Sequence, residues 1–185
     1  MDLQQIDSSW TLFLDRDGVI NIEKKNDYVV SWEDFIFYEG VTEALQLLNP
    51  LFRTIVIVTN QKCIGKGLLT TEGLLHIHSQ MLNKINTAGG RIDKIYFCPD
   101  LEDDSPNRKP NAGMAFQAKA DFPHINFSKS LMVGNKLSDM QFGKTAGINT
   151  VFMATTNPET PYPHPLVDLR FNSLIDFARA LTQPK

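Results

Sequence analysis

The chain has 185 residues, of which 42% are hydrophobic and 21% are charged, and its formal net charge is −3. This length and composition predict a single globular domain spanning residues 1–185, and the charge gives no basic footprint for nucleic acid. No apolar run approaches the roughly 20 residues of a membrane span, and residues 1–10 lack a signal-peptide stretch, so no membrane association is expected. The two cysteines, Cys63 and Cys98, indicate no disulfide framework, which predicts a cytoplasmic protein.

Short apolar runs and stretches of helical periodicity alternate along the chain. The apolar runs predict strands at residues 12–14, 54–58, 92–98, 131–133, 150–153 and 168–171. The periodic stretches predict helices after Gly40, after Thr70 or Thr71, after Asn111, near Ser138 and at 173–181, and Thr70 or Thr71 and Asn111 are suited to cap the helices that follow them. This alternation favours a three-layer α/β/α sandwich with a mostly parallel sheet.

Other features have a structural interpretation. The stretch 22–38 is charged and aromatic without a helical period, and we expect a compact hairpin or loop that shapes a substrate entrance or simply packs down through its aromatic side chains. His76 and His78 lack partners at ligand spacing, so we interpret them as surface or packed histidines. Cys63 is interpreted as a packed or partly exposed thiol, because no histidine is placed to activate it.

Two carboxylates, Asp15 and Asp17, follow the first predicted strand. In open α/β sheets, ligands bind in the crevice beyond the carboxyl ends of the strands, where these side chains would lie. Carboxylates this close repel each other unless a cation lies between them, and their hard oxygen atoms suit Mg²⁺. Gly18 then allows a tight turn. The alternative is an ordinary surface turn, since Asp and Gly are common turn residues.

Polar residues also follow or approach three further strands: Thr59 and Asn60, then Lys109, then Asn135 and Asp139. Parallel strands bring these ends to one edge of the sheet. A carboxylate nucleophile, hydroxyl and amide donors, a lysine and a metal-binding group are the components needed to transfer a phosphoryl group through an aspartyl-phosphate. Coincidence at four strand ends is hard to sustain, which argues against the surface turn.

Four motifs contain these residues: Asp15-Arg16-Asp17-Gly18, Thr59-Asn60-Gln61, Arg108-Lys109-Pro110 and Gly134-Asn135-Lys136-Leu137-Ser138-Asp139. They cover most of the chain and resemble the four motifs of the haloacid dehalogenase superfamily of phosphatases. Within it, the stretches 28–29, 60–67, 96–99, 108–114 and 132–141 are most similar to heptose bisphosphate phosphatases, with the related histidinol-phosphate phosphatases next. The resemblance implies a Rossmann-like α/β fold without a large cap domain.

The same resemblance implies a role for each matching residue. Asp15 would attack phosphorus and become the aspartyl-phosphate. Asp17 would protonate the leaving sugar oxygen and then deprotonate the hydrolytic water. Thr59 and Asn60 would donate hydrogen bonds to the transferring phosphoryl group, and Lys109 would neutralise its charge while steadying Asp15.

The resemblance further implies a Mg²⁺ site. Its ligands would be the Asp15 carboxylate, the Asp17 backbone carbonyl and residue 135, with Asp139 supporting that last group from behind. The family usually has an aspartate where this chain has Asn135. Because an amide keeps a hard oxygen that can coordinate Mg²⁺, we expect weakened metal affinity rather than loss of catalysis.

Arg108 is expected to hold a second, non-reacting phosphate of the substrate, a task suited to a bidentate guanidinium. Such remote binding can orient the substrate, and Lys66 could help in the same way. The alternative for Arg108 is a surface ion pair with Glu102, Asp103 or Asp104.

A structural zinc loop, built from several cysteines and a histidine, precedes the Arg-Lys-Pro motif in many relatives. Here only Cys98 remains, and Asp100 stands near the expected histidine. Ser105 and Asn107 fill cysteine positions. A tetrahedral zinc site cannot be assembled from these residues, and no zinc is expected.

The resemblance therefore implies Mg²⁺-dependent removal of a phosphate from a sugar bisphosphate, D-glycero-D-manno-heptose 1,7-bisphosphate, in lipopolysaccharide biosynthesis. The partner would be this small phosphorylated sugar, and we expect a monomer. One alternative is histidinol-phosphate or general sugar-phosphate hydrolysis, which shares all four motifs. Another is a phosphosugar-binding homologue that Asn135 has weakened as a catalyst, although the intact nucleophile and acid/base pair argue against it.

Overall fold

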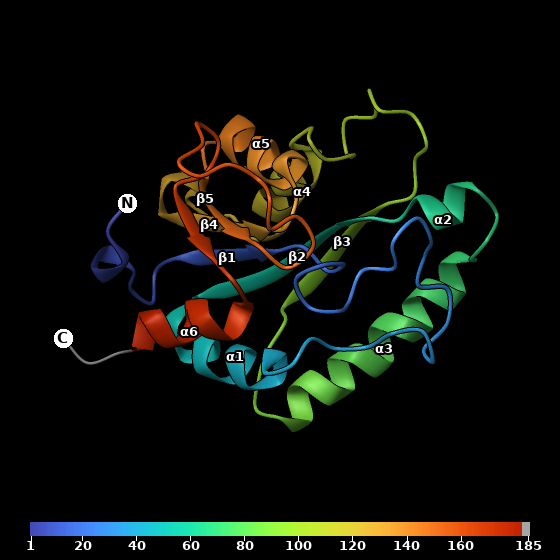
Figure 1. The fold of residues 1–185 in the computed structure, drawn as a ribbon, viewed down its shortest axis with the longest axis horizontal. Coiled ribbons are helices and arrows are strands. Elements are labelled where there is room, and N and C mark those ends of the chain that lie inside the picture. Colours follow the sequence, from blue (N-terminus) through green and yellow to red (C-terminus); the bar gives the residue numbers. More distant parts are fainter. Residues whose placement is uncertain (183–185) are drawn as a thin grey trace.

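The computed structural model describes residues 1–182, which contain a six-stranded sheet in the order β3-β2-β1-β4-β5-β6 (Figure 1). Every neighbouring pair of strands is parallel. The strands are β1 (Thr11–Leu14), β2 (Thr54–Asn60), β3 (Lys94–Cys98), β4 (Ser130–Gly134), β5 (Asn149–Met153) and β6 (Leu169–Phe171). The strand order reverses its direction between β1 and β4, and ligands bind at such switch points in open sheets. The predicted parallel α/β architecture is confirmed.

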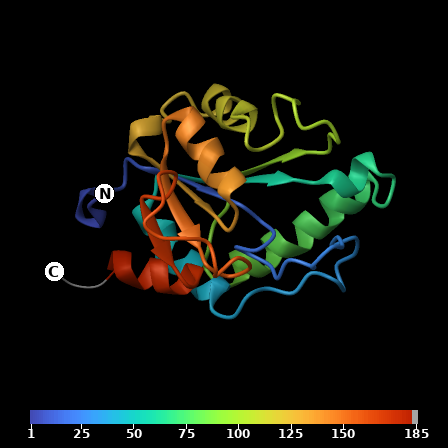
Figure 2. The same ribbon diagram turned by 45° about the horizontal axis from the view of Figure 1, so that its top comes forward.

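Helices cover both faces of the sheet (Figures 1 and 2). One face carries α1 (Val41–Leu48), α3 (Thr71–Thr87) and α6 (Leu174–Thr182), and the other carries α4 (Gly113–Asp121) and α5 (Leu137–Ala146). Successive side chains of a strand point to opposite faces, so Leu12 and Leu14 enter the core with α1, α3 and α6, whereas Phe13 enters the core with α4 and α5. Burial on both faces explains why the strands read as continuous apolar runs.

The segment 22–38 runs alongside α3 in both views (Figures 1 and 2). Its two ends are paired, because the N–H of Ile22 donates to the carbonyl of Ile36 at 2.8 Å. Within it, the rings of Trp32 and Phe35 stack with their centroids 5.3 Å apart. The segment is thus a compact hairpin-like loop held down by aromatic packing, as predicted.

The predicted cap of α4 is wrong. The side-chain amide of Asn111 donates instead to the backbone carbonyls of Asp103 (3.3 Å) and Ser105 (2.9 Å). The helix begins two residues later, at Gly113, without a side-chain cap. A side chain that is needed to hold the preceding loop cannot also cap the helix, and local sequence does not reveal that competition.

Other boundaries shift by a residue or two. The strand β2 continues to Asn60, because it pairs there with Cys98 of β3. A short helix that the sequence did not predict, α2 (Lys62–Gly65), lies between β2 and α3. Three 3₁₀ segments complete the secondary structure of the described residues: Leu3–Gln5, Asn49–Leu51 and Phe127–Lys129. None of the helices within residues 1–182 is long and apolar enough to cross a membrane.

Candidate active site

A cleft of about 900 Å³ opens beyond the carboxyl ends of the central strands. Of the residues predicted to form the site, all but Asn135 line this cleft: Asp15, Asp17, Thr59, Asn60, Lys66, Arg108, Lys109 and Asp139. Asn135 is fully buried and contacts two residues of the cleft wall, Glu23 through its side chain and Asp139 through its backbone. The fold therefore brings the four sequence motifs to one place.

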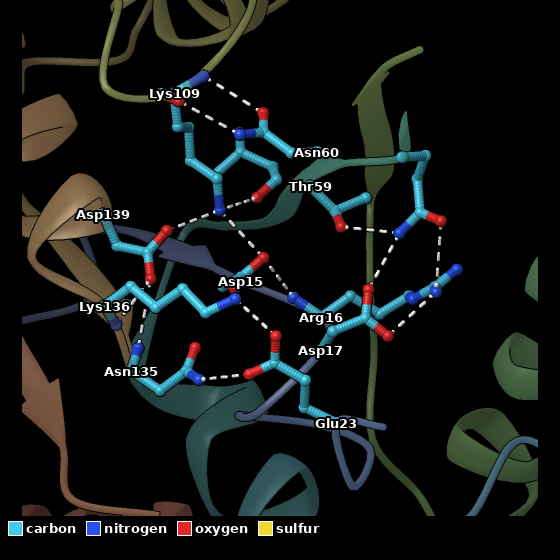
Figure 3. Close-up of polar contacts among 12 residues, drawn as sticks. Asp15, Arg16, Asp17, Glu23, Thr59, Asn60, Lys109, Asn135, Lys136 and Asp139 are labelled. Atoms are coloured by element: carbon cyan, nitrogen blue, oxygen red, sulfur yellow. Dashed lines mark hydrogen bonds and ion pairs between the residues drawn. The ribbon is translucent and has the colours of Figure 1, made fainter. Parts of the chain in front are cut away.

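Lys109 is the buried centre of the site (Figure 3). Its Nζ lies 2.8 Å from Oδ1 of Asp15 and 2.7 Å from Oδ1 of Asp139, and it donates to the carbonyl of Val58 at 2.9 Å. These contacts use the three donors of the ammonium group, which fixes its position. Burial acts to lower the pKa of Lys109, but the two carboxylates outweigh it and raise that pKa, so the lysine stays charged.

Asp15 stands directly after β1. Its N–H donates to the carbonyl of Val133 at 2.9 Å, which continues the pairing with β4, and its Oδ1 accepts from the N–H of Arg16 at 2.8 Å. Burial raises the pKa of Asp15 to about 7; the ion pair with Lys109 opposes this shift, and the nearby charge of Asp139 adds to it. A further cation beside Asp15 would lower this pKa and favour the carboxylate.

The turn after Asp15 requires a glycine. Gly18 has φ of +92°, in the region that side chains disfavour. A Cβ at this position would also lie 2.0 Å from Nδ2 of Asn135, well inside any allowed contact. The glycine therefore allows Asn135, from β4's loop, to pack against the turn that carries both aspartates.

Asp17 accepts three hydrogen bonds of 2.9 Å, from Nη2 of Arg16, Nδ2 of Asn21 and Nε2 of Gln61. Burial acts to raise the pKa of Asp17, but the Arg16 charge and these hydrogen bonds outweigh it and hold the pKa below its ordinary value. Arg16 itself is buried, and its Nη1 lies 3.0 Å from Nε2 of His78. Since an arginine only donates, His78 must accept as a neutral ring.

Sequence reasoning did not identify Arg16, Asn21 and Gln61 as partners of Asp17. It also did not identify His78 as the partner of Arg16. Arg16 could have been suspected as a partner of an aspartate, because it stands between Asp15 and Asp17 in the sequence. The remaining contacts join residues up to 62 positions apart, and periodicity gives no signal for them. The structural interpretation of His78 is confirmed, and the buried Cys63 is a packed thiol whose pKa burial raises.

Thr59 and Asn60 end β2 in different environments. The hydroxyl oxygen of Thr59 accepts from Nε2 of Gln61 at 2.9 Å, so its own hydrogen remains available to donate into the cleft. The amide of Asn60 forms two 3.0 Å hydrogen bonds with the backbone of Lys109, one to its carbonyl and one from its N–H. Asn60 thus positions Lys109, a role that the sequence did not suggest, and its donation to a phosphoryl group stays a prediction.

Asp139 links two parts of the site. Its Oδ2 accepts from the N–H groups of Asn135 (3.1 Å) and Lys136 (3.0 Å) at the start of α5, while its Oδ1 binds Lys109. It therefore holds the Asn135 backbone in place and also holds Lys109. Both groups would be displaced if this carboxylate were removed.

A magnesium site can be tested against the chemistry of the donors. Within residues 1–182 no group of three or more His, Cys, Asp and Glu side chains could hold a metal ion. Oδ1 of Asn135 is buried and has no hydrogen-bond partner among the described residues. Such an orphaned oxygen is costly, and a hard cation would satisfy it. Together with the carboxylate of Asp15, this donor fits Mg²⁺.

The outer part of the cleft carries cations on loops and on α2. Nε of Arg108 lies 3.1 Å from Oδ1 of Asp103, which also lies 3.3 Å from Nζ of Lys62. Nζ of Lys66 lies 5.0 Å from the centre of the Tyr28 ring. Arg108 thus forms one of the ion pairs considered as its alternative role, and it lines the cleft as well. Its contact with a substrate phosphate stays a prediction.

The loop between β3 and the Arg-Lys-Pro motif is held by hydrogen bonds. Oγ of Ser105 contacts Oδ2 of Asp100 and lies 3.8 Å from Sγ of Cys98. Nη1 of Arg108 donates to the carbonyl of Asp100 at 3.3 Å. The positions that could have carried zinc ligands are therefore occupied by an internal polar network, and the expectation of no zinc stays a prediction.

Two aspartates follow the first strand of the parallel sheet, and the first of them pairs with a buried lysine that the aspartate of α5 also holds. This arrangement defines the class of haloacid dehalogenase-like hydrolases. A family model described as HAD-hydrolase-like matches residues 106–162. The D-glycero-beta-D-manno-heptose-1,7-bisphosphate 7-phosphatase of Yersinia pestis is 36% identical over 179 residues, which cover 92% of this chain and 94% of the relative. The D-glycero-alpha-D-manno-heptose-1,7-bisphosphate 7-phosphatase of Campylobacter jejuni is 41% identical over 142 residues, covering 77% and 80%.

A solved structure supports the same relationship. The D,D-heptose 1,7-bisphosphate phosphatase from B. bronchiseptica, complexed with magnesium and phosphate, superposes with a TM-score of 0.85 at 28% identity, covering 93% of this chain and 97% of that one. The chain therefore belongs to the haloacid dehalogenase-like phosphatases, in the family of the D-glycero-D-manno-heptose-1,7-bisphosphate 7-phosphatases. It is a phosphoric monoester hydrolase.

Proposed function

We propose that this protein is a Mg²⁺-dependent phosphatase that removes one phosphate from D-glycero-D-manno-heptose 1,7-bisphosphate through an aspartyl-phosphate on Asp15. The observation that carries the proposal is the buried arrangement of Asp15, Lys109 and Asp139, in which one ammonium group holds both carboxylates within 2.8 Å. This arrangement orients Asp15 before any substrate arrives, and preorganised charge of this kind is a main source of catalysis.

In the first step, a carboxylate oxygen of Asp15 attacks phosphorus and the bond from phosphorus to the sugar oxygen breaks. Asp17 gives a proton to the departing oxygen. Its pKa is low in the free site, but the approach of an anionic phosphate raises the pKa of a neighbouring carboxyl group and favours the protonated form. The hydroxyl of Thr59 donates to the phosphoryl oxygens, and Lys109 balances their charge.

In the second step, Asp17 takes a proton from water, and the resulting nucleophile attacks the aspartyl-phosphate. The acyl-phosphate bond breaks, inorganic phosphate leaves and the carboxylate of Asp15 is regenerated. Mg²⁺, bound by the Asp15 carboxylate, the Asp17 carbonyl and the Asn135 amide oxygen, would supply the positive charge that draws phosphoryl oxygens toward Asp15. Asp139 holds the backbone of Asn135 throughout.

The substrate class is inferred from the relatives and from the outer cleft. Curated relatives are named for the alpha and for the beta anomer of the heptose bisphosphate. Arg108 and Lys66 line the cleft beyond the reacting centre, where they can bind the second phosphate. The small bisphosphorylated sugar is thus the partner that we propose, for a monomer folded as one domain. A cytoplasmic location is proposed because Cys63 and Cys98 are both free thiols.

A substrate panel tests the proposal. Phosphate release would be measured at millimolar Mg²⁺ from both anomers of the heptose 1,7-bisphosphate, from the 7-monophosphate and from histidinol phosphate. We expect one bisphosphate to have a kcat/KM at least about tenfold above the monophosphates, since a second phosphate adds charged hydrogen bonds. Equal values would reject the bisphosphate assignment and favour general sugar-phosphate hydrolysis. No release from any compound would favour a phosphosugar-binding homologue.

A further inference from the structure

Glu23 lies beside Asn135, a ligand of the proposed Mg²⁺ site, without belonging to any of the four motifs (Figure 3). Its Oε2 accepts from Nδ2 of Asn135 at 3.2 Å, and its Oε1 pairs with Nζ of Lys136. The residue follows the turn of Asp15 and Asp17 and lines the cleft. The carboxylate is therefore held at a fixed place between the loop after β1 and the start of α5.

This contact decides which way the Asn135 amide faces. Nδ2 of Asn135 has two neighbours, Glu23 and the hydroxyl of Thr156. A hydroxyl can donate or accept and would tolerate either orientation of the amide, whereas an ionised carboxylate can only accept. A rotated Asn135 would place its oxygen against the Glu23 carboxylate, which is repulsive. Glu23 therefore keeps the nitrogen on its own side and the amide oxygen on the side of Asp15, as Figure 3 shows.

The same carboxylate also supplies charge. An amide ligand brings a hard oxygen to Mg²⁺ but no negative charge, so Asn135 alone leaves Asp15 as the charged ligand of the proposed set. Glu23 places a negative charge directly behind the amide of Asn135, in contact with its nitrogen. It polarises the amide so that the oxygen becomes a better donor to a cation, as a partner behind a metal ligand commonly does.

We propose that Glu23 is a positioning residue matched to Asn135: it orients the amide oxygen toward the Mg²⁺ site and strengthens it as a ligand. The inference rests on the metal site of the proposed function. It also predicts that the benefit of Glu23 depends on an amide at position 135, because a carboxylate there would need no orienting partner and would be repelled by Glu23.

A double-mutant cycle tests this dependence with Mg²⁺ alone and no substrate. The Mg²⁺ dissociation constant would be measured by isothermal titration calorimetry for the wild type, Glu23→Gln, Asn135→Asp and the double variant. Glutamine keeps the shape of Glu23 but presents a donor and an acceptor, so it no longer selects one orientation of Asn135. In the wild-type background, we expect Glu23→Gln to raise the Mg²⁺ dissociation constant about tenfold. In the Asn135→Asp background, the same substitution should raise it by a factor at least about three times smaller.

Asp27→Asn is the matched control, because Asp27 also lines the cleft but is not a partner of Asn135. Its effect should be less than half that of Glu23→Gln, and melting curves in EDTA would verify that all variants fold. Equal effects of Glu23→Gln in both backgrounds, or no effect, would overturn the inference. Failure of the wild type to bind Mg²⁺ at all would instead overturn the metal site of the proposed function.

Discussion

The inner and outer parts of the cleft are built in different ways. At its base, the side chains of Lys109 and Asp139 are 3% and 2% exposed, and their contacts are fixed by neighbouring backbone groups. At its mouth, the side chain of Asp103 is 87% exposed and shares its carboxylate between Lys62 and Arg108. Buried ion pairs are costly to break, whereas exposed pairs contribute little to stability and are easily exchanged.

This contrast separates chemistry from recognition. The base can hold a reacting group in one geometry, because none of its charged partners can leave without making another buried charge unpaired. The mouth can exchange its internal carboxylate for a substrate phosphate at small cost, because water already solvates the Asp103 carboxylate. Substitutions at the base should therefore affect turnover or folding strongly, and substitutions at the mouth should change KM by modest factors.

The largest effect is expected for Asp15→Asn. The amide cannot form the acyl-phosphate, and the change should lower kcat by at least about 10³-fold. Phosphate release under single-turnover conditions measures it. The fold should survive, because Lys109 keeps its ion pair with Asp139 and the change removes the repulsion between Asp15 and Asp139, and a melting curve checks this. Release within tenfold of the wild type would mean that another group is the nucleophile and that the base of the cleft has been misassigned.

A pH effect on stability follows from the buried ring of His78. Burial, reinforced by the Arg16 charge, lowers the pKa of His78 to about 3 from its ordinary 6.5. Between these values the unfolded chain binds one more proton, so the free energy of unfolding falls as the pH drops below 6.5. The loss is up to about 1.4 kcal/mol per pH unit, or about 2 kcal/mol at pH 5.

His78→Gln should remove this component, because glutamine can accept from Arg16 without titrating. Urea unfolding between pH 7 and pH 5 would show a shallower decline in the variant. The matched control is His76→Gln, an exposed histidine of the same helix, which should leave the decline as in the wild type. An equal decline in the free energy of unfolding for the wild type and His78→Gln would show that His78 becomes protonated without cost. The inner part of the cleft would then be less rigid than its contacts indicate.

At the mouth, Arg108→Ala should raise KM for the heptose bisphosphate about 10- to 100-fold, the range expected for loss of charged hydrogen bonds. The kcat should change little, and KM for the 7-monophosphate should stay within about twofold of the wild-type value, because that substrate lacks the second phosphate. Steady-state kinetics with both substrates measures the difference. An equal rise for both would place Arg108 at the reacting phosphate and would erase the division between base and mouth.

The base was largely predictable from sequence because strand ends carry it. Asp15, Thr59 and Asp139 each lie within a few residues of a strand, and parallel pairing alone brings such positions together. The supporting contacts were not predictable in this way. Gln61 reaches Asp17 across 44 residues, and Glu23 reaches Asn135 across 112, from a segment that has no periodicity.

The wrong cap at Asn111 has the same origin. Its residue type suits a cap, yet the loop that precedes it competes for the same amide and wins. Arg108 is difficult to predict for a different reason. Its guanidinium pairs with Asp103 in the free protein, and we propose that it contacts a phosphate when substrate is bound. A sequence can name both partners, but only the exposure of Asp103 in the structure shows that the first pairing is easily broken.

The smallest effect tests this exchange directly. Arg108 and Lys62 hold the pKa of Asp103 below its ordinary value, so its carboxylate is charged and competes with a phosphate for both cations. Asp103→Asn should therefore lower KM for the bisphosphate about two- to threefold, and the gain should shrink as salt screens the wild-type pairs. The neighbouring exposed residue provides the control variant Asp104→Asn, which should leave KM unchanged. A higher KM in Asp103→Asn would instead mean that Asp103 holds Arg108 in its binding orientation, and the mouth would then be as preorganised as the base.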